Sequence, residues 1–163
     1  MKKTLFVLAF SLISVLAFAQ KQLPDLSLKT LEGKPINARQ LAQKDKITVI
    51  SFWATWCAPC QKELQAIMPK YDDWQKKYNM DMVAVTIDNA QGLPKVKPLV
   101  AQKKWKYNVV SDVNSQLLAQ MGGQNVPYTV IVDGKGNVVY MHNGYKDGDE
   151  LELEKKLATL STK

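Results

Sequence analysis

Trp53-Ala54-Thr55-Trp56-Cys57-Ala58-Pro59-Cys60 contains both cysteines of this 163-residue chain. The run before it, Ile47-Thr48-Val49-Ile50-Ser51-Phe52, is mostly apolar and rich in β-branched residues, which predicts a buried strand. The residues after it have the spacing of one apolar helix face, given by Leu64, Ile67, Met68, Tyr71 and Trp74. We therefore expect the cysteines where a strand ends and a helix begins, with Pro59 in the first helical turn, where its missing N–H is harmless.

The position of the two cysteines indicates redox chemistry. Unpaired N–H groups and partial positive charge at a helix N-terminus favour a thiolate over a thiol, and a Cys-x-x-Cys spacing there is typical of a redox pair. A zinc site needs about four ligands, whereas the chain has two cysteines and a single histidine, His142. Two inert core cysteines fit a helix start poorly. We therefore predict a redox-active dithiol, with no metal site and no other cofactor.

The segment from Phe52 to Cys60 reads F-W-A-x-W-C-x-P-C, which resembles the active-site segment of thioredoxin-like proteins. With Glu63 it becomes Cys-x-x-Cys-x-x-Glu, which is similar to TlpA/ResA-type extracytoplasmic thiol-disulfide proteins, where this glutamate is implicated in proton handling. Thioredoxin instead has an aspartate just before Phe-Trp-Ala, and this chain has Ser51 there. The resemblance thus implies that Glu63 is the acid/base of the dithiol. The residues alone favour the alternative, an exposed acid that the helix dipole stabilises in the first turns.

Residues 1–19 have the pattern of a signal peptide. Lys2 and Lys3 precede an apolar stretch, and Ala17-Phe18-Ala19 forms a small-x-small cleavage site, so Gln20 is expected to begin the mature chain. The apolar stretch is shorter than the roughly 20 residues of a membrane-spanning helix, although an uncleaved anchor is the alternative. The sequence therefore predicts a periplasmic or secreted protein whose residues 20–163 form one thioredoxin-like domain.

For an exported protein, the two cysteines could form either a structural disulfide or a pair for disulfide exchange. Most cysteines of exported proteins form structural disulfides. A disulfide between Cys57 and Cys60 closes a loop too small to remove much entropy from the unfolded chain, so it would stabilise the folded protein little. We therefore expect the pair to serve disulfide exchange.

The rest of the chain predicts an α/β fold that resembles the thioredoxin-like fold, with a central mixed β-sheet flanked by helices. The expected strands, in addition to the one before the cysteines, are a short N-terminal hairpin around residues 26–34 and the segments 81–87, 108–111, 129–132 and 138–142. The expected helices are one from about Pro59 to Tyr78, one after Pro94, one marked by Leu117, Leu118 and Met121, and a last one that starts in the acidic segment 147–150. Compared with thioredoxin, this chain is expected to have two additional parts, the hairpin and an αβ unit inserted before the Pro127 loop. In these additions it resembles TlpA/ResA-like proteins.

Two helix details follow from single residues. Pro69 lies inside the helix that runs from about Pro59 to Tyr78, and it is expected to kink or split that helix. Asp147-Gly148-Asp149-Glu150 has the spacing of a capping box at the start of the last helix.

Pro127 is the second expected part of the site. The residues alone indicate a loop whose proline starts a strand, which is common. In thioredoxin-like proteins the proline at this place is cis and lies against the dithiol, so the resemblance implies a cis Val126–Pro127 bond. The backbone at Val126 would then face a bound polypeptide. Trp56, Ala58 and Pro59 would border the same exchange site.

Composition excludes some partners. The formal net charge is +7, but charges of both signs alternate along the chain and no basic stripe with interleaved aromatic residues occurs, so nucleic acid is not an expected partner. His142 falls on the last expected strand, and nothing in the sequence connects it to the dithiol, so we interpret it as a surface or packing residue. The chain is expected to be a monomer.

The expected function is thiol-disulfide exchange. Cys57 would attack a disulfide in a protein substrate, and Cys60 would resolve the mixed disulfide. No charged residue lies between the cysteines to stabilise the reduced form strongly, which favours a reductant that draws electrons from a membrane partner. The resemblance to TlpA/ResA-type proteins implies apocytochrome c as one target. The alternatives are a peroxide-reducing redoxin of the same fold and a non-enzymatic binding domain.

Overall fold

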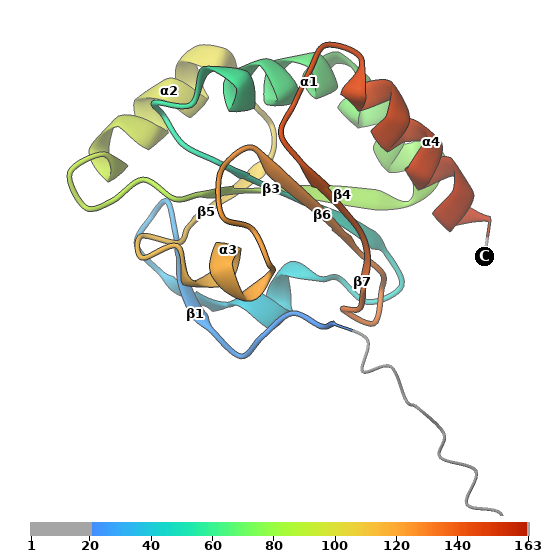
Figure 1. Ribbon diagram of the computed structural model, residues 1–163, viewed down its shortest axis with the longest axis horizontal. Helices are drawn as coiled ribbons and strands as arrows, with labels where there is room; N and C mark the ends of the chain where they lie inside the picture. Colours follow the sequence, from blue (N-terminus) through green and yellow to red (C-terminus); the bar gives the residue numbers. More distant parts are fainter. Residues whose placement is uncertain (1–20, 163) are drawn as a thin grey trace, which may run out of the picture.

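The computed structural model describes residues 21–162, so the expected leader, residues 1–19, lies outside the described residues. One seven-stranded sheet forms the centre of the protein (Figure 1). Its strands in chain order are β1 (Ser27–Thr30), β2 (Pro35–Asn37), β3 (Ile47–Trp53), β4 (Met80–Thr86), β5 (Asn108–Ser111), β6 (Tyr128–Val132) and β7 (Val138–Asn143).

The strands lie in the order β2-β1-β5-β4-β3-β6-β7. The pairs β3–β4 and β4–β5 are parallel, and all other neighbours are antiparallel, so the sheet is mixed as expected. All of β4, and β3 from Thr48 onward, are buried on both faces, which explains their continuous apolar sequences. The strand that leads to the cysteines therefore lies deep inside the sheet.

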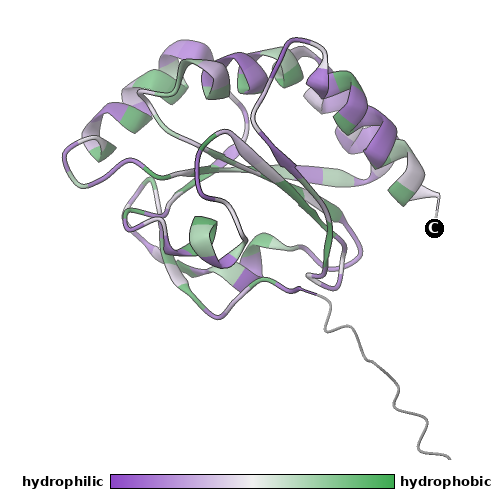
Figure 2. Cartoon of the chain, viewed as in Figure 1, coloured by the Kyte–Doolittle hydropathy of each residue, from purple (hydrophilic) through white to green (hydrophobic). Residues whose placement is uncertain are grey.

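Helices cover both faces of the sheet (Figure 1). On one face lie α1 (Ala58–Tyr78), α2 (Val96–Lys103) and α4 (Asp149–Ser161), with the short 3₁₀ turn η2 (Leu93–Lys95) before α2. On the other face lie α3 (Gln116–Gln120) and the 3₁₀ turn η1 (Ala38–Leu41). Two separate apolar clusters result, one on each face. Figure 2 shows the matching pattern, with apolar residues along the central strands and a mixture of polar and apolar residues on the helices.

The N-terminal hairpin and the inserted αβ unit are present at the positions that the sequence predicted. β1 and β2 form the expected hairpin, with Leu28 opposite Ile36. The expected αβ unit is α2 followed by β5, which adds a strand between β4 and the hairpin. Within residues 21–162, no helix is long and apolar enough to cross a membrane.

Pro69 does not split the helix that contains it. α1 is a single helix of 21 residues that continues through Pro69; a proline removes only one main-chain hydrogen bond, and Ile67, Tyr71 and Trp74 are packed in the core on both sides of it. The capping box at Asp147 does not form either. Gly148, at φ 102°, is the residue that caps α4, and its N–H donates to Glu150.

Gly123 is required by close packing next to the Pro127 loop. A Cβ atom at this position would lie 2.2 Å from Leu118 Cδ1 and 2.8 Å from Tyr128 Cδ1. The leucine end could move, but the tyrosine ring is buried and its hydroxyl donates to the Met121 carbonyl at 2.9 Å.

We predict that Gly123→Ala lowers the free energy of unfolding by about 1–3 kcal/mol, because overpacking a filled site forces neighbours to shift. Urea denaturation at neutral pH measures this effect. Gln124→Ala, at the exposed next position, is the matched control and should change stability little. Equal stability of Gly123→Ala and the wild type would contradict the packing argument.

Candidate active site

The two cysteines lie at the start of α1, and a disulfide joins them with a Cα–Cα distance of 5.3 Å. Cys57 is the residue that caps the helix, and its sulfur accepts the Cys60 N–H at 3.3 Å. Pro59 lies in the first turn, as expected. The sulfur of Cys57 is therefore at the positive end of a 21-residue helix, which stabilises the thiolate in the reduced protein. Cys57 exposes 4% of its surface and Cys60 none.

Asp88 anchors the loop that carries the cysteines. It is fully buried just after β4, and its carboxylate accepts the Thr55 N–H at 2.8 Å and the Thr55 hydroxyl at 2.6 Å. The Thr86 hydroxyl donates to the same carboxylate at 2.6 Å. Asp88 was not predicted from the sequence. Its position as an acid directly after an apolar strand is the feature that could have indicated a role. Asp88 joins the end of β4 to the residue two positions before Cys57.

Trp56 is the exposed part of the site. Its side chain is 69% exposed, and Ala58 and Pro59 are also exposed beside the buried disulfide. Trp56 borders a cleft of about 770 Å³ whose other walls include Pro94 and Leu99, from η2 and α2. This cleft was not expected from the sequence, because it depends on how the inserted helix sits against the active-site loop.

Pro127 lies beside the end of β3. The Val126–Pro127 peptide bond is cis, as the resemblance implied. The antiparallel register pairs Phe52 with Tyr128, which brings Pro127 next to Trp53 across the sheet. Pro127 is buried, and its carbonyl accepts the Gly144 N–H at 2.8 Å. The Pro127 loop and the Cys57 loop therefore lie at the same end of the sheet.

Glu63 is buried, with 4% of its surface exposed, so the exposed-acid alternative is wrong. Its carboxylate accepts hydrogen bonds from the Thr129 hydroxyl at 2.7 Å and the Ser51 hydroxyl at 3.3 Å. Burial raises the pKa of Glu63 to about 7, and the two hydrogen bonds oppose this shift only partly. Ser51, the residue at which thioredoxin has its aspartate, thus serves here as a partner of Glu63.

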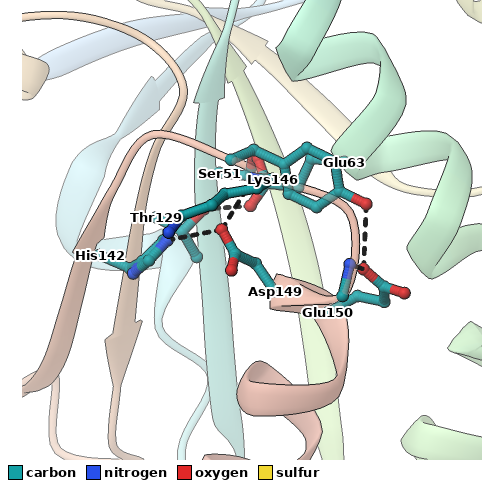
Figure 3. Close-up of polar contacts among 9 residues, drawn as sticks. Ser51, Glu63, Thr129, His142, Lys146, Asp149 and Glu150 are labelled. Atoms are coloured by element: carbon teal, nitrogen blue, oxygen red, sulfur yellow. Dashed lines mark hydrogen bonds and ion pairs between the residues drawn. The ribbon is translucent and has the colours of Figure 1, made fainter.

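His142 lies near the hydrogen bonds of Glu63, whereas the sequence predicted a surface or packing residue. It pairs with Thr129 in the register of β6 and β7, and its Nε2 is 3.2 Å from Asp149 Oδ2 (Figure 3). Figure 3 shows Ser51, Glu63, Thr129, His142 and Asp149 gathered between the sheet and the start of α4. Across residues 21–162, no group of three or more His, Cys, Asp or Glu side chains is placed to hold a metal ion.

Comparisons with known proteins agree with this fold. The model of the AhpC/TSA family matches residues 19–141. Thiol-disulfide oxidoreductase ResA of Bacillus thuringiensis is 30% identical over 132 residues, which cover 81% of this chain and 73% of that protein. The thioredoxin-like protein YneN of Bacillus subtilis is 32% identical over 135 residues, covering 81% of this chain and 75% of that protein. The solution structure of a thioredoxin-like protein from Porphyromonas gingivalis has a TM-score of 0.78 at 43% identity, covering 88% of this chain and 94% of that one.

A thioredoxin-like sheet that presents a Cys-x-x-Cys pair at the start of a helix, with these relatives, defines the class of thiol-disulfide oxidoreductases. Within that class, the chain belongs to the AhpC/TSA family.

The burial of Glu63 makes stability depend on pH. Its pKa in the folded protein, about 7, lies above the value of 4.5 in the unfolded chain. The folded state therefore holds this proton more tightly, and stability falls as the pH rises from about 4.5 to about 7.

We predict that Glu63→Gln becomes progressively more stable than the wild type over this pH range, by up to about 3 kcal/mol at the alkaline end. The measurement is urea denaturation of both oxidised proteins at acidic and mildly alkaline pH. Glu152→Gln, on the exposed face of α4, is the control and should follow the wild type. A stability difference that does not change with pH would rule out a titrating Glu63.

Proposed function

We propose that this oxidoreductase reduces disulfides of proteins outside the cytoplasm. The observation that carries this proposal is the joint placement of Cys57 and Cys60 at the start of α1 with Glu63 buried on the same helix. The dithiol supplies two electrons, and Glu63 supplies a proton acceptor close to neutral pH.

The proposed reaction has two exchange steps. In the first, the Cys57 thiolate attacks one sulfur of the substrate disulfide, a mixed disulfide forms, and the other substrate sulfur leaves as a thiolate that takes a proton from water. In the second, the Cys60 thiol gives its proton to the Glu63 carboxylate and attacks Cys57 Sγ. The second substrate sulfur leaves as a thiolate and takes a proton from water, the Cys57–Cys60 disulfide forms, and the substrate has gained two electrons and two protons.

The proposed substrates are polypeptides that cover the Cys57 loop and the Pro127 loop together. Trp56, Ala58 and Pro59 present exposed surface on one side. The backbone of Val126 would pair with an extended substrate segment on the other side, giving main-chain hydrogen bonds that do not depend on substrate sequence. The enzyme would act as a monomer, since one chain contains all of these groups.

A reducing direction is supported by the residues between the cysteines. A strong oxidant depends on a stabilised reduced form, and Ala58 and Pro59 bring no charge to stabilise it. Outside the cytoplasm such a reductant needs electrons from a membrane partner. The thiols of apocytochrome c are the target that the resemblance suggests.

The location rests on the leader pattern of residues 1–19. We predict that the exported protein begins at Gln20, because Ala17-Phe18-Ala19 provides the small residues that signal peptidase requires. Mass spectrometry of the protein purified from the extracytoplasmic fraction measures the N-terminus. An intact Met1 in that fraction would contradict cleavage.

Insulin reduction tests the proposed activity. We predict that the wild type with dithiothreitol precipitates insulin chains faster than dithiothreitol alone. Cys57→Ser should abolish the acceleration because the attacking sulfur is lost, and Cys60→Ser should accumulate the mixed disulfide because nothing resolves it. Trapping of the substrate on Cys60→Ser is visible on a non-reducing gel.

Other outcomes distinguish the alternatives. Consumption of peroxide with a sulfenic acid on Cys57 would identify a peroxide-reducing redoxin. Partner binding that survives the loss of both cysteines, without insulin reduction, would identify a binding domain. A reduction potential near about −120 mV, as in the strong oxidant DsbA, would reverse the direction.

A further inference from the structure

A row of polar side chains crosses the sheet from Glu63 toward its edge. Ser51 on β3 lies opposite Thr129 on β6, and Thr129 lies opposite His142 on β7. Side chains at paired positions of neighbouring strands point to the same face of a sheet. The three side chains therefore form one line, and Glu63 lies over it from α1, bonded to the first two.

The neighbouring row of paired residues on the same face is apolar. On the same face, Val49 is paired with Ile131, and Ile131 with Tyr140. Valine, isoleucine and tyrosine there belong to the apolar cluster under α1 and α4. Polar groups inside such a cluster cost stability unless they are hydrogen-bonded.

The line ends at solvent. β7 is an edge strand, and the His142 side chain is 35% exposed. Asp149 holds the imidazole, since its Oδ2 lies 3.2 Å from His142 Nε2 and also accepts the Lys146 N–H at 2.8 Å. A neutral imidazole that donates from Nε2 to this carboxylate keeps Nδ1 as a proton acceptor.

A small cavity connects the two ends of the line. Its volume is about 10 Å³, and its walls include Glu63, Thr129, Tyr140, His142 and Asp149. A space of this size has room for about one water molecule, and the walls provide the polar partners that such a water needs. The cavity therefore gives a proton a path between the buried carboxyl and the imidazole.

The other titratable groups around Glu63 do not offer a second path. Tyr107 just before β5 and Tyr145 before α4 both have pKa values raised above the ordinary range, mainly by burial, and stay neutral. The Glu150 carboxylate already accepts hydrogen bonds from the Tyr145 hydroxyl and the Gly148 N–H. His142 favours the charged form of Glu63, and Asp149 opposes it.

We propose that His142, positioned by Asp149, is the group that passes protons between Glu63 and solvent during thiol-disulfide exchange. This inference rests on the proposed role of Glu63 as acid/base. When Cys60 gives its proton to Glu63, the proton moves through the cavity to the His142 imidazole and leaves to water from the imidazolium. In the reverse direction the same atoms carry one proton inward, and no electrons are transferred along this path.

The test is the rate at which dithiothreitol reduces the Cys57–Cys60 disulfide, followed by quenching, alkylation and mass spectrometry. This half-reaction needs a proton for the Cys60 sulfur and no physiological substrate. His142→Gln keeps an amide that can donate to Asp149 but cannot transfer a proton. We expect it to slow reduction about tenfold in dilute buffer near neutral pH, less than the roughly 10²–10⁴-fold effect of a direct general acid or base, because His142 acts through Glu63.

Rescue separates proton transfer from a structural role. Imidazole added to His142→Gln should restore most of the rate, whereas it should leave the wild type and Met141→Gln unchanged. Met141 precedes His142 on β7, is 50% exposed and does not line the cavity, so Met141→Gln is the matched control. Thermal denaturation of each variant reports on folding.

Two results would overturn the inference. One is a His142→Gln rate equal to that of the wild type at every buffer concentration. The other is a slow variant that imidazole does not rescue, which would make the histidine a structural clamp between β7 and α4. Failure of the proposed function looks different, because the wild type would then not accelerate insulin reduction, whatever the effect of His142→Gln on the half-reaction.

Discussion

The pairing of β3 with its two neighbours is the constraint on which the site depends. On one side β3 pairs in parallel with β4, which ends beside Asp88 and so fixes Thr55. On the other side it pairs antiparallel with β6, so that Thr129 lies opposite Ser51. A slip of one residue in the second register would turn Thr129 to the opposite face of the sheet and leave Glu63 without its shorter hydrogen bond.

Glu63 shows how the fold accommodates a charge-bearing group where apolar residues dominate. Two hydroxyls partly replace the water that burial removes, and they do so without adding a second charge. The ionised form is therefore disfavoured enough for Glu63 to exchange its proton near neutral pH. A lysine or arginine partner would instead have locked it as a carboxylate.

The sequence predicted the parts of the fold that depend on local pattern. The strand before Cys57, the helix after it and the N-terminal hairpin follow from periodicity and turn residues. The burial of Glu63 and the place of His142 could not be predicted in this way, because both depend on which strand lies beside β6. Asp88 was missed because its partner Thr55, in the loop after β3, comes next to the end of β4 only when these two strands pair in the folded chain.

The anchoring of Thr55 by Asp88 has a consequence for partner recognition. The loop before Cys57 is already fixed by two hydrogen bonds to one buried carboxylate before any partner binds. Little conformational entropy is then lost at this loop when a complex forms, so the site is preorganised. Affinity for different partners should accordingly be set by the surfaces around Trp56, and the shape of the reactive loop should be common to all of its complexes.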